Sequence, residues 1–381
     1  MDFQWTDAQR AFRKEVQMFL RDNLPEDWET QAHHGPGSAG QTHFSRTFCG
    51  KLAEAGLLVP HWPEDWGGRG LDPWCQLILA EEMWAAGEPR GAQYMNVNWI
   101  GPTLMRYGSE AQKARYLPPI ARGDAIWCQG FSEPDAGSDL ASLRTRATRS
   151  GESYRIDGQK IWTSYAGLAE TCFLLARTSP DRKRGISIFL VPMKTPGIEV
   201  RSIPSLIGEG DIHEVYFDGV EVPAHARLGE EGDAWSIIGY TLKNERLGIP
   251  RYVLAQRALE RAVSTLTEQG RYGDCAAHAR AGHAAALCEA ARLQSYAIIT
   301  RRAEGGEIGP EASTARVATV MAERAVAEFV TEFLPETLCT GDPLLKAHHQ
   351  RAIVAGIASG SAEIQLNIVA TDVLQLPREP R

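Results

Sequence analysis

Two short segments constrain the fold of this 381-residue chain more than any other feature of its sequence. Residues 129–139 read Gln-Gly-Phe-Ser-Glu-Pro-Asp-Ala-Gly-Ser-Asp, and residues 158–164 read Gly-Gln-Lys-Ile-Trp-Thr-Ser. Each segment alone is typical of a loop beside a strand, because glycine, proline and aspartate favour turns, whereas Ile, Trp and Thr favour strands. Their occurrence together, in this order, is far more specific than either one.

The composition and charge are those of an ordinary globular protein. Hydrophobic residues make up 43% of the chain and charged residues 23%, and the length allows two or three packed layers or domains. The net charge of −8, with acidic and basic residues interleaved, argues against a nucleic-acid partner. No apolar run reaches the roughly 20 residues that span a membrane. The N-terminus lacks the basic and apolar regions of a signal peptide, so we expect a cytoplasmic protein.

The cysteines and histidines predict no metal site. The seven cysteines are scattered without a Cys-x-x-Cys pair, which favours reduced thiols over a disulfide framework or a zinc site. His33 and His34 lie in a Gly/Pro-rich stretch without a third ligand nearby in sequence, so we interpret them as part of a solvated loop.

The spacing of apolar residues changes twice along the chain. Residues 1–125 follow a helical pattern, with one helix expected to begin at Thr6-Asp7 and another to end at Pro118-Pro119. Residues 126–228 contain short apolar runs between turn residues, which predicts strands. The helical pattern returns over residues 229–381. We therefore expect an α+β protein with an N-terminal helical domain, a middle β-barrel or sandwich domain and a C-terminal four-helix bundle.

Four long helices are expected in the C-terminal segment, over residues 234–265, 284–302, 312–333 and 344–374. Pro250 is expected to bend the first of them. Apolar residues on more than one face of that first helix predict that another helix or chain covers it. These residues are Ile237, Ile238, Leu242, Leu247, Ile249 and Val253.

The two segments resemble the flavin-holding core of the acyl-CoA dehydrogenase family. Residues 131–139 fill every specified position of its Phe-Ser/Thr-Glu-Pro-x-Ala-Gly-Ser-Asp signature, and residues 158–164 match its Gly-x-Lys-x-Trp strand. The resemblance covers nearly the whole chain and is strong up to about residue 250. It implies the family fold, FAD as cofactor and an acyl-CoA substrate. In the implied reaction the carbon α to the thioester loses a proton, and a hydride passes from the β-carbon to flavin N5.

The same resemblance implies a FAD-binding role for residues of both segments. These residues are Gln129, Phe131, Ser132, Gly137, Ser138, Trp162, Thr163 and Ser164. Those before Gly137 would line the isoalloxazine ring, while Gly137 and Ser138 would approach a phosphate. Trp162 would cover one flavin face, and Thr163 and Ser164 would form hydrogen bonds near N5. Ser138 is also expected to contact the substrate.

The catalytic base is a harder assignment. Many family members carry a glutamate shortly before a Ser-Glu-Ile-Gln stretch, and residues 363–365 fix that register here, which puts Ser359 at the glutamate position. A serine without an activating partner is no base, so we expect its replacement by alanine to matter little. Isovaleryl-type and long-chain-type members instead carry a Glu-Arg pair on the first long C-terminal helix. The match of Glu245-Arg246 implies Glu245 as the base and Arg246 as a substrate contact.

The motifs that hold the adenine half of FAD in many members are weak in this chain. Only Arg271 and Gly273 match one of these motifs, and residues 338–343 lack the paired glycines of the other. This pattern resembles the subunits of heterotetrameric bacterial acyl-CoA dehydrogenases of steroid side-chain degradation, in which a divergent partner chain completes the assembly. Ala358-Ser359 also replaces a larger Tyr-Glu beside the flavin, which suits a bulky or branched acyl group.

Three functions are compatible with these residues. An FAD-dependent acyl-CoA dehydrogenase would pass electrons to an electron-transfer flavoprotein or a similar acceptor. A flavin oxidase of the same fold would pass them to oxygen, and a non-catalytic or flavin-sharing subunit would complete another chain's site. We favour the dehydrogenase, as a homo- or hetero-oligomer with a related chain, because both the loop of residues 129–139 and Glu245 are present.

Overall fold

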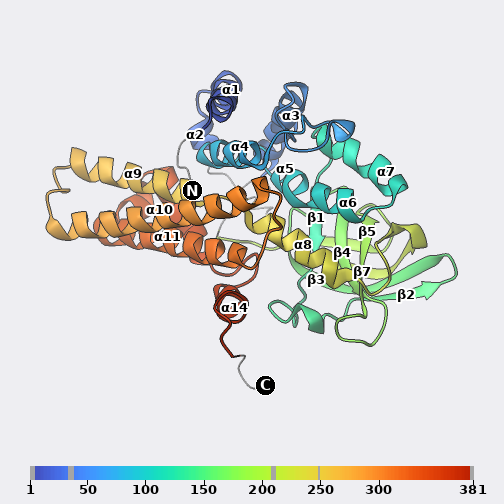
Figure 1. Cartoon of the computed structure of the whole chain (residues 1–381). Helices are drawn as coiled ribbons and strands as arrows, with labels where there is room; N and C mark the ends of the chain where they lie inside the picture. The colour runs from blue at the N-terminus through green and yellow to red at the C-terminus, as the bar shows by residue number, and fades with distance from the viewer. Residues whose placement is uncertain (1–4, 33–37, 207–211, 248, 378–381) are drawn as a thin grey trace. The chain divides into compact units, whose positions relative to one another are not determined.

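The structure is a computed structural model that describes residues 5–32, 38–206, 212–247 and 249–377 (Figure 1). His33 and His34 lie outside the described residues. The chain forms two compact units. Unit 1 comprises Met1–His33, Leu71–Pro89 and Glu245–Arg381, and unit 2 comprises His34–Gly70 and Arg90–Asn244.

The described part of unit 2 contains one mixed eight-stranded sheet, ordered β6-β7-β3-β2-β4-β5-β8, with β1 paired in parallel to β4. The strands are β1 Trp127–Gly130, β2 Arg146–Ser150, β3 Ser153–Ser164, β4 Thr171–Arg177, β5 Ile186–Pro192, β6 Ile198–Ser202, β7 Ile212–Pro223 and β8 Arg227–Leu228. Strands β4 and β5 are buried on both faces, as their continuous apolar sequences predict. The long antiparallel pair of β3 and β7 instead alternates buried and exposed residues over much of its length.

Short helices complete unit 2. They include α3 Ala39–Glu54, η1 Glu64–Trp66, α5 Gln93–Met95, η2 Asn96–Ile100, α6 Gly101–Tyr107, α7 Glu110–Ala121, η3 Leu140–Ser142 and η4 Ala224–Ala226. The prediction that a helix ends at Pro118-Pro119 is wrong, because α7 continues to Ala121. A proline lacks an N–H donor but keeps its carbonyl acceptor. Pro118 accepts from the Arg122 N–H at 3.1 Å and Pro119 from the Asp124 N–H at 2.9 Å, which closes the last turn.

Unit 1 begins with α1, Asp7–Asn23, whose start at Thr6-Asp7 confirms the prediction. The Thr6 hydroxyl accepts from the Gln9 N–H at 3.2 Å, and the Gln9 side chain accepts from the Thr6 N–H at 3.0 Å, which forms a capping box. The other helices of this unit include α2 Trp28–Gln31, α4 Pro73–Ala85, α9 Tyr252–Glu268, α10 Cys275–Ala303, α11 Glu311–Phe333, α12 Thr337–Thr340, α13 Pro343–Val354, α14 Ala362–Ile368 and η5 Val369–Val373.

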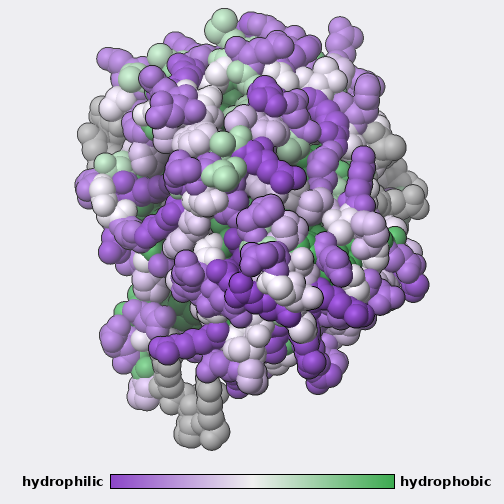
Figure 2. All heavy atoms as spheres, turned by 90° about the vertical axis from the view of Figure 1, so that its right-hand side faces the viewer, coloured by the Kyte–Doolittle hydropathy of each residue, from purple (hydrophilic) through white to green (hydrophobic). Residues whose placement is uncertain are grey.

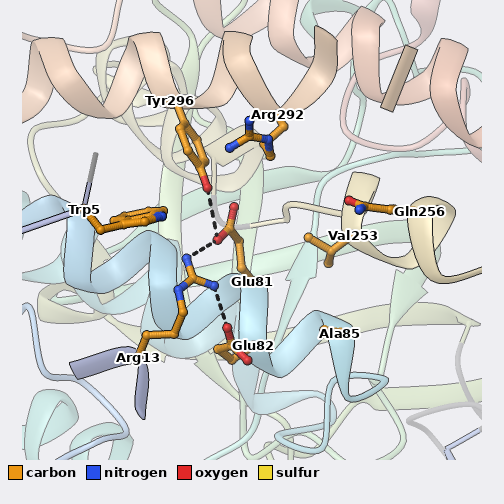
Figure 3. Close-up of a pocket in the computed structure, with 9 residues that line it drawn as sticks. All are labelled: Trp5, Arg13, Glu81, Glu82, Ala85, Val253, Gln256, Arg292 and Tyr296. Atoms are coloured by element: carbon orange, nitrogen blue, oxygen red, sulfur yellow. Dashed lines mark hydrogen bonds and ion pairs between the residues drawn. The ribbon is translucent and has the colours of Figure 1, made fainter. Parts of the chain in front are cut away.

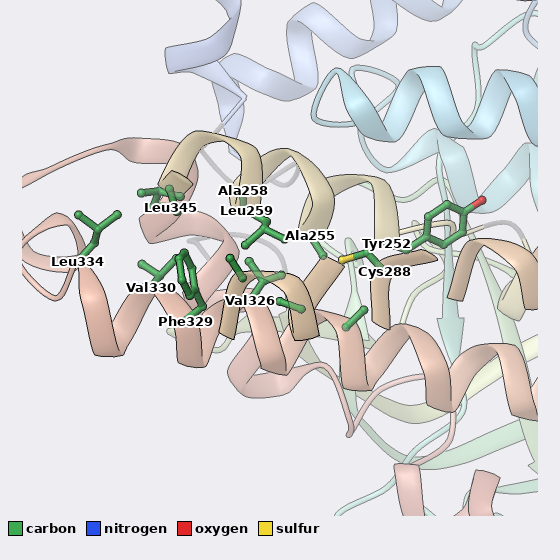
Figure 4. Close-up of a cluster of buried hydrophobic side chains, with 14 of the residues drawn as sticks. Tyr252, Ala255, Ala258, Leu259, Cys288, Val326, Phe329, Val330, Leu334 and Leu345 are labelled. Atoms are coloured by element: carbon green, nitrogen blue, oxygen red, sulfur yellow. The ribbon is translucent and has the colours of Figure 1, made fainter. Parts of the chain in front are cut away.

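The core of the C-terminal helices lies along α9, α10 and α11 (Figure 4). Small residues on α9 and α10, such as Ala255, Ala258 and Ala284, allow these helices to approach closely, while Phe329 and Leu345 fill the remaining space. Burial of such side chains stabilises the helices by about 25 cal/mol per Å² of apolar surface.

Two predicted helices are each interrupted. The helix expected over residues 234–265 is split into α8, Ala234–Leu247, and α9, which begins at Tyr252, because Pro250 breaks it rather than bends it. The helix expected over residues 344–374 stops at Val354 and resumes at Ala362. In the turn between these helices Ser359 and Gly360 adopt φ values of 62° and 84°, which no right-handed helix accommodates.

The predicted α+β architecture, with helical segments on either side of a β-segment, is confirmed. The exact domain boundaries at residues 125 and 228 stay a prediction. Hydrophilic residues predominate on the face drawn in Figure 2, with apolar residues in small groups, as the charged composition leads one to expect. Among the described residues, no helix is long and apolar enough to cross a membrane.

Candidate active site

The loop after β1 is fixed against β3 by backbone and side-chain contacts. A tight turn joins Glu133 and Ala136 through two backbone hydrogen bonds of 2.9 and 3.1 Å. The Ser132 carbonyl accepts from the Ile161 N–H at 3.0 Å, and the Phe131 ring lies 6.0 Å from the ring of Phe173 on β4. The two segments singled out in the sequence are therefore side by side in unit 2.

A buried ion pair joins these segments. Lys160 Nζ lies 2.8 Å from Glu133 Oε1 and also donates to the Phe131 carbonyl at 3.0 Å. The Glu133 carboxylate accepts two further hydrogen bonds, from the N–H of Arg144 at 2.6 Å and of Thr145 at 2.9 Å. Both charged groups thus have the partners that burial demands.

The ionisation of this pair follows from its surroundings. Burial alone would raise the pKa of Glu133, but the Lys160 ammonium and the hydrogen bonds to the carboxylate hold it below the usual value. Burial lowers the pKa of Lys160, and the charge of Glu133 offsets part of this effect. Neither residue was predicted to have a role, although both stand at specified positions of the two segments.

Trp162 is presented to the outside of the sheet by an irregularity in β3. The register of β3 against β7 shifts between Lys160 and Thr163, and Trp162 in this bulge has φ 59°. Such a value is rare for a bulky residue and costs free energy of about 1–3 kcal/mol. The Trp162 side chain is 60% exposed. A large, strained and exposed aromatic residue is suited to cover a planar ligand.

Two buried polar atoms of the two segments have no hydrogen-bond partner within the described part of the chain. They are Gln129 Nε2 at the end of β1 and Thr163 Oγ1 on β3. An unsatisfied buried polar group costs about 1–3 kcal/mol, so each of these atoms needs a partner from outside the chain, such as a ligand or a water. An amide donor, a hydroxyl and a flat aromatic surface fit the polar edge and the face of an isoalloxazine ring.

The glycines of the two segments have different roles. Gly158 has φ 151°, and a Cβ atom there would lie 2.6 Å from Thr145 Oγ1, so only glycine fits. Gly137 has open space around it, and Ser138 is exposed in the loop that follows the Glu133–Ala136 turn. Ser164 is half-buried at the end of β3, opposite Ile212 of β7.

Glu245 and Ser359 lie in contact within unit 1. Glu245 is in the last turn of α8, and Ser359 is in the turn between α13 and α14. The Ser359 hydroxyl donates to Glu245 Oε1 at 2.5 Å. The side chain of Arg246, the predicted substrate contact, lies outside what the structure describes.

The backbone on both sides of Ser359 is held by two buried side chains. Arg316 Nη2 on α11 donates to the Ala355 and Ala358 carbonyls, each at 3.2 Å. Gln365 Nε2 on α14 donates to the Ser359 carbonyl at 3.1 Å and to that of Gly360 at 3.4 Å. Gln365 thus has a structural role, because it fixes the turn that contains Ser359.

A pocket in unit 1 contains none of the predicted site residues (Figure 3). It is lined by Trp5, Arg13, Glu81, Glu82, Ala85, Val253, Gln256, Arg292 and Tyr296. Arg13 forms ion pairs with Glu81 at 2.8 Å and with Glu82 at 2.5 Å, and Tyr252 donates to Glu81 at 2.7 Å. Because these groups bind one another, we assign them to the stability of the unit. Among the described residues no cluster of metal-ligating side chains occurs.

Three family models match consecutive parts of the chain and identify its protein family. The acyl-CoA dehydrogenase N-terminal domain matches residues 6–124, the middle domain residues 128–220 and the C-terminal domain residues 232–374. The chain belongs to the acyl-CoA dehydrogenase family. Members of this family are flavoprotein oxidoreductases, so the chain is assigned as an acyl-CoA dehydrogenase and FAD is the implied cofactor.

Relatives within the acyl-CoA dehydrogenase family match almost the entire chain. Acyl-CoA dehydrogenase IpdE1 of Mycobacterium tuberculosis is 34% identical, over 97% of this chain and 98% of the relative. The structure called Tcur3481-Tcur3483 steroid ACAD is 30% identical with a TM-score of 0.90. The ChsE4-ChsE5 complex from Mycobacterium tuberculosis is 27% identical with a TM-score of 0.88. Both structural alignments cover 100% of each chain.

Proposed function

We propose that this chain dehydrogenates the α,β-bond of an acyl-CoA thioester with a bulky or branched acyl group, using Glu245 as the base. The hydrogen bond between Ser359 and Glu245 carries this proposal. Family members place the base at one of two positions that are far apart in sequence, and in this chain those positions are in contact. A carboxylate at Glu245 therefore occupies the neighbourhood that a glutamate at position 359 would occupy.

The proposed FAD site comprises residues of the two signature segments in unit 2. Trp162 would cover one face of the ring, and the unsatisfied atoms of Gln129 and Thr163 would form hydrogen bonds to its polar edge. Phe131, Ser132 and Ser164 would complete the lining, and Gly137 and Ser138 would lie near the phosphates. When bound, FAD supplies the acceptor at N5 for the hydride that leaves the β-carbon.

The proposed base acts on the carbon α to the thioester. An ionised carboxylate can accept the α-proton when the acyl group excludes water from around it, since desolvation makes the carboxylate more basic. Arg246, the next residue of α8, is proposed to contact the substrate. Ser138 is proposed as a second substrate contact.

The size of the acyl group and the electron acceptor are also part of the proposal. Ala358-Ser359 stands where many members carry a Tyr-Glu pair, and the loss of the tyrosine ring supports a bulky acyl group. The similarity to a structure named as a steroid ACAD supports a steroid-derived acyl chain as a candidate. An electron-transfer flavoprotein or a similar carrier is the proposed acceptor.

A related partner chain is proposed to complete the FAD site. Two of the similar structures have titles that name two chains each, Tcur3481-Tcur3483 and ChsE4-ChsE5. The weak match to the adenine-binding motif around Arg271 also favours a FAD site that is shared between two chains. Arg271 forms an ion pair with Glu336 at 2.7 Å and donates to the Phe333 carbonyl at 2.6 Å. These contacts bind this arginine to the helix bundle of its own chain.

Glu245→Gln tests the base directly. The amide keeps the shape of the side chain but cannot accept the α-proton, so turnover should fall by about 100- to 10,000-fold. The flavin absorbance per chain should stay at the wild-type value. Glu363→Gln on the exposed start of α14 is the matched control and should keep normal turnover. Near-normal turnover of Glu245→Gln would refute the assignment, and hydrogen peroxide formed without an added acceptor would indicate an oxidase.

A further inference from the structure

We propose that Ser359 is a positioning residue that holds the Glu245 carboxylate in place and in its ionised form through a hydrogen bond to Oε1. This inference rests on the proposed function of Glu245 as the base. It assigns a role to a hydroxyl that the family resemblance leaves without one. It also replaces the expectation, drawn from sequence alone, that removal of this hydroxyl matters little.

The contact itself has the geometry of a charge-assisted hydrogen bond. The distance from Ser359 Oγ to Glu245 Oε1 is 2.5 Å, within the range of about 2.5–2.7 Å typical of O–H···O⁻ bonds. Such bonds are about twice as strong as those between neutral groups. A hydroxyl that donates to a carboxylate favours the charged form and limits its rotation.

The location of Glu245 at a helix end gives a hydrogen-bond donor a favourable electrostatic effect. Glu245 lies in the last turn of α8, and the aligned peptide dipoles create a partial negative charge at that end of a helix. A carboxylate at such a helix end is disfavoured relative to its neutral form. The Ser359 hydroxyl offsets this effect because it brings the positive end of an O–H dipole to the carboxylate.

The structure holds the serine backbone in an unfavourable conformation. Ser359 has φ 62°, a value that is uncommon for residues other than glycine and that persists only where the surroundings impose it. Arg316 donates to the carbonyls of Ala355 and Ala358, and Gln365 donates to the carbonyl of Ser359 itself. Arg316 is 6% exposed and Gln365 is fully buried, so both donors are fixed by packing.

These contacts form a chain of support that ends at the base. Arg316 and Gln365 fix the turn, the turn fixes the direction of the Ser359 hydroxyl, and the hydroxyl fixes Glu245 Oε1. A carboxylate held in one orientation can meet the α-proton without first losing rotational freedom. Ser359 takes no part in bond making, so its removal should weaken catalysis without abolishing it.

Variants at position 359 test the role of the hydroxyl. Ser359→Ala removes the hydroxyl and keeps a Cβ, whereas Ser359→Gly removes it and also relieves the backbone strain. Both variants should lower kcat/KM by about tenfold near neutral pH, the scale of one hydrogen bond to a charged group. Both should also move the acidic limb of the pH profile, which is the fall of kcat/KM at low pH, to higher pH. The reason is that the ionised carboxylate loses its hydrogen-bond donor.

A second readout isolates the proton transfer from electron transfer to an acceptor. Incorporation of deuterium from D₂O at the α-carbon of the acyl-CoA, followed by mass spectrometry without an electron acceptor, reports on the base alone. It should slow in both variants by the same factor as kcat/KM. The matched control is Ser361→Ala, two residues away, because the Ser361 hydroxyl accepts from the Ile364 N–H at 3.3 Å and caps α14. This control should lower the melting temperature and leave the acidic limb unchanged.

The outcomes separate this inference from the proposed function. An acidic limb that stays at its wild-type position in both variants overturns the role of Ser359, as does a shift in Ser359→Ala that is absent from Ser359→Gly. If Glu245→Gln keeps normal turnover, Glu245 is not the base, and the positioning role of Ser359 is refuted with it. Loss of turnover in Glu245→Gln together with an unchanged limb in both Ser359 variants refutes only the positioning role.

Discussion

The buried pair of Glu133 and Lys160 joins the loop after β1 to strand β3. The Lys160 side chain is 0% exposed and that of Glu133 is 7% exposed, so neither charge is screened by water. Removal of one partner of such a pair leaves an uncompensated buried charge, which costs about 3–5 kcal/mol. The pair therefore ties the segment that contains Phe131 to the strand that contains Trp162.

Lys160→Met should therefore lower the unfolding free energy by about 3–5 kcal/mol and reduce the flavin content of the purified protein. Denaturant unfolding and the flavin absorbance per chain measure these two effects. Lys113→Met is a control, because the Lys113–Glu110 pair involves a glutamate that is 84% exposed and should cost less than about 1 kcal/mol. The double variant Glu133→Gln/Lys160→Met leaves no unpaired buried charge and should be more stable than Lys160→Met alone, although one backbone N–H loses its acceptor. Equal instability of the two would contradict the charge argument.

The sequence predicts which residues bind FAD, and that assignment stays a prediction, but it did not predict the contacts that arrange them. Gln129 and Trp162 belong to segments that a family resemblance identifies directly. The partnership of Glu133 with Lys160 depends on a turn and a β-bulge that bring distant backbone positions together, and pattern alone contains no distance. For the same reason the contact of Ser359 with Glu245 was outside the reach of sequence analysis.

At the scale of helices, the sequence located most elements but not their interruptions. The helical pattern continues across Pro250 and across residues 355–361, because apolar spacing does not record where the backbone leaves the helix. Pro118 and Pro119 do not end α7, because their carbonyl groups still accept from the N–H groups of Arg122 and Asp124 in the last turn. Ile237 and Ile238, expected on a face that another helix or chain covers, are 0% and 1% exposed within the described chain.

The contact between α13 and α11 predicts a pH dependence of stability. His348 on α13 is buried, and its Nε2 donates to the Glu323 carbonyl on α11 at 3.2 Å. Burial lowers the pKa of His348 from 6.5 to about 4, although the hydrogen bond to Glu323 opposes this shift. The unfolded chain therefore binds a proton below pH 6.5 that the folded chain binds only near pH 4. The stability should fall as the pH decreases through this window.

His348→Gln tests this dependence with a neutral side chain. The wild-type protein should lose up to about 3 kcal/mol of unfolding free energy through this residue between pH 6.5 and pH 4, relative to the variant. Above pH 7 the two proteins should differ by a constant amount. Melting temperatures measured at steps of half a pH unit show the effect. Parallel curves over the acidic range would show that His348 is not responsible.

At the scale of the whole molecule, the exposed apolar residues concentrate in one stretch of the chain. Among the described residues, large exposed hydrophobic side chains occur at Ile353, Ile357, Leu366, Val373, Leu374 and Leu376. Elsewhere such side chains are more scattered, for example Met18 on α1. A concentration of this kind is typical of a surface that another chain covers. We therefore propose that a partner chain covers the stretch from α13 through η5 to Leu376 rather than α8.

Charged substitutions in this stretch should weaken the assembly. Ile357 is 68% exposed and Leu374 is 60% exposed, so a glutamate at either position is tolerated by the single chain but is costly where a partner covers it. Ile357→Glu and Leu374→Glu should reduce the mass measured by light scattering after size exclusion, while the melting temperature of the smaller species changes little. Met18→Glu, at a position 53% exposed on α1, is the control and should leave the mass unchanged.

If the partner supplies part of the FAD site, the flavin content per chain should fall together with the mass in these variants. A chain that stays monomeric with one FAD would refute sharing, because it would hold the adenine half alone despite its weak motifs.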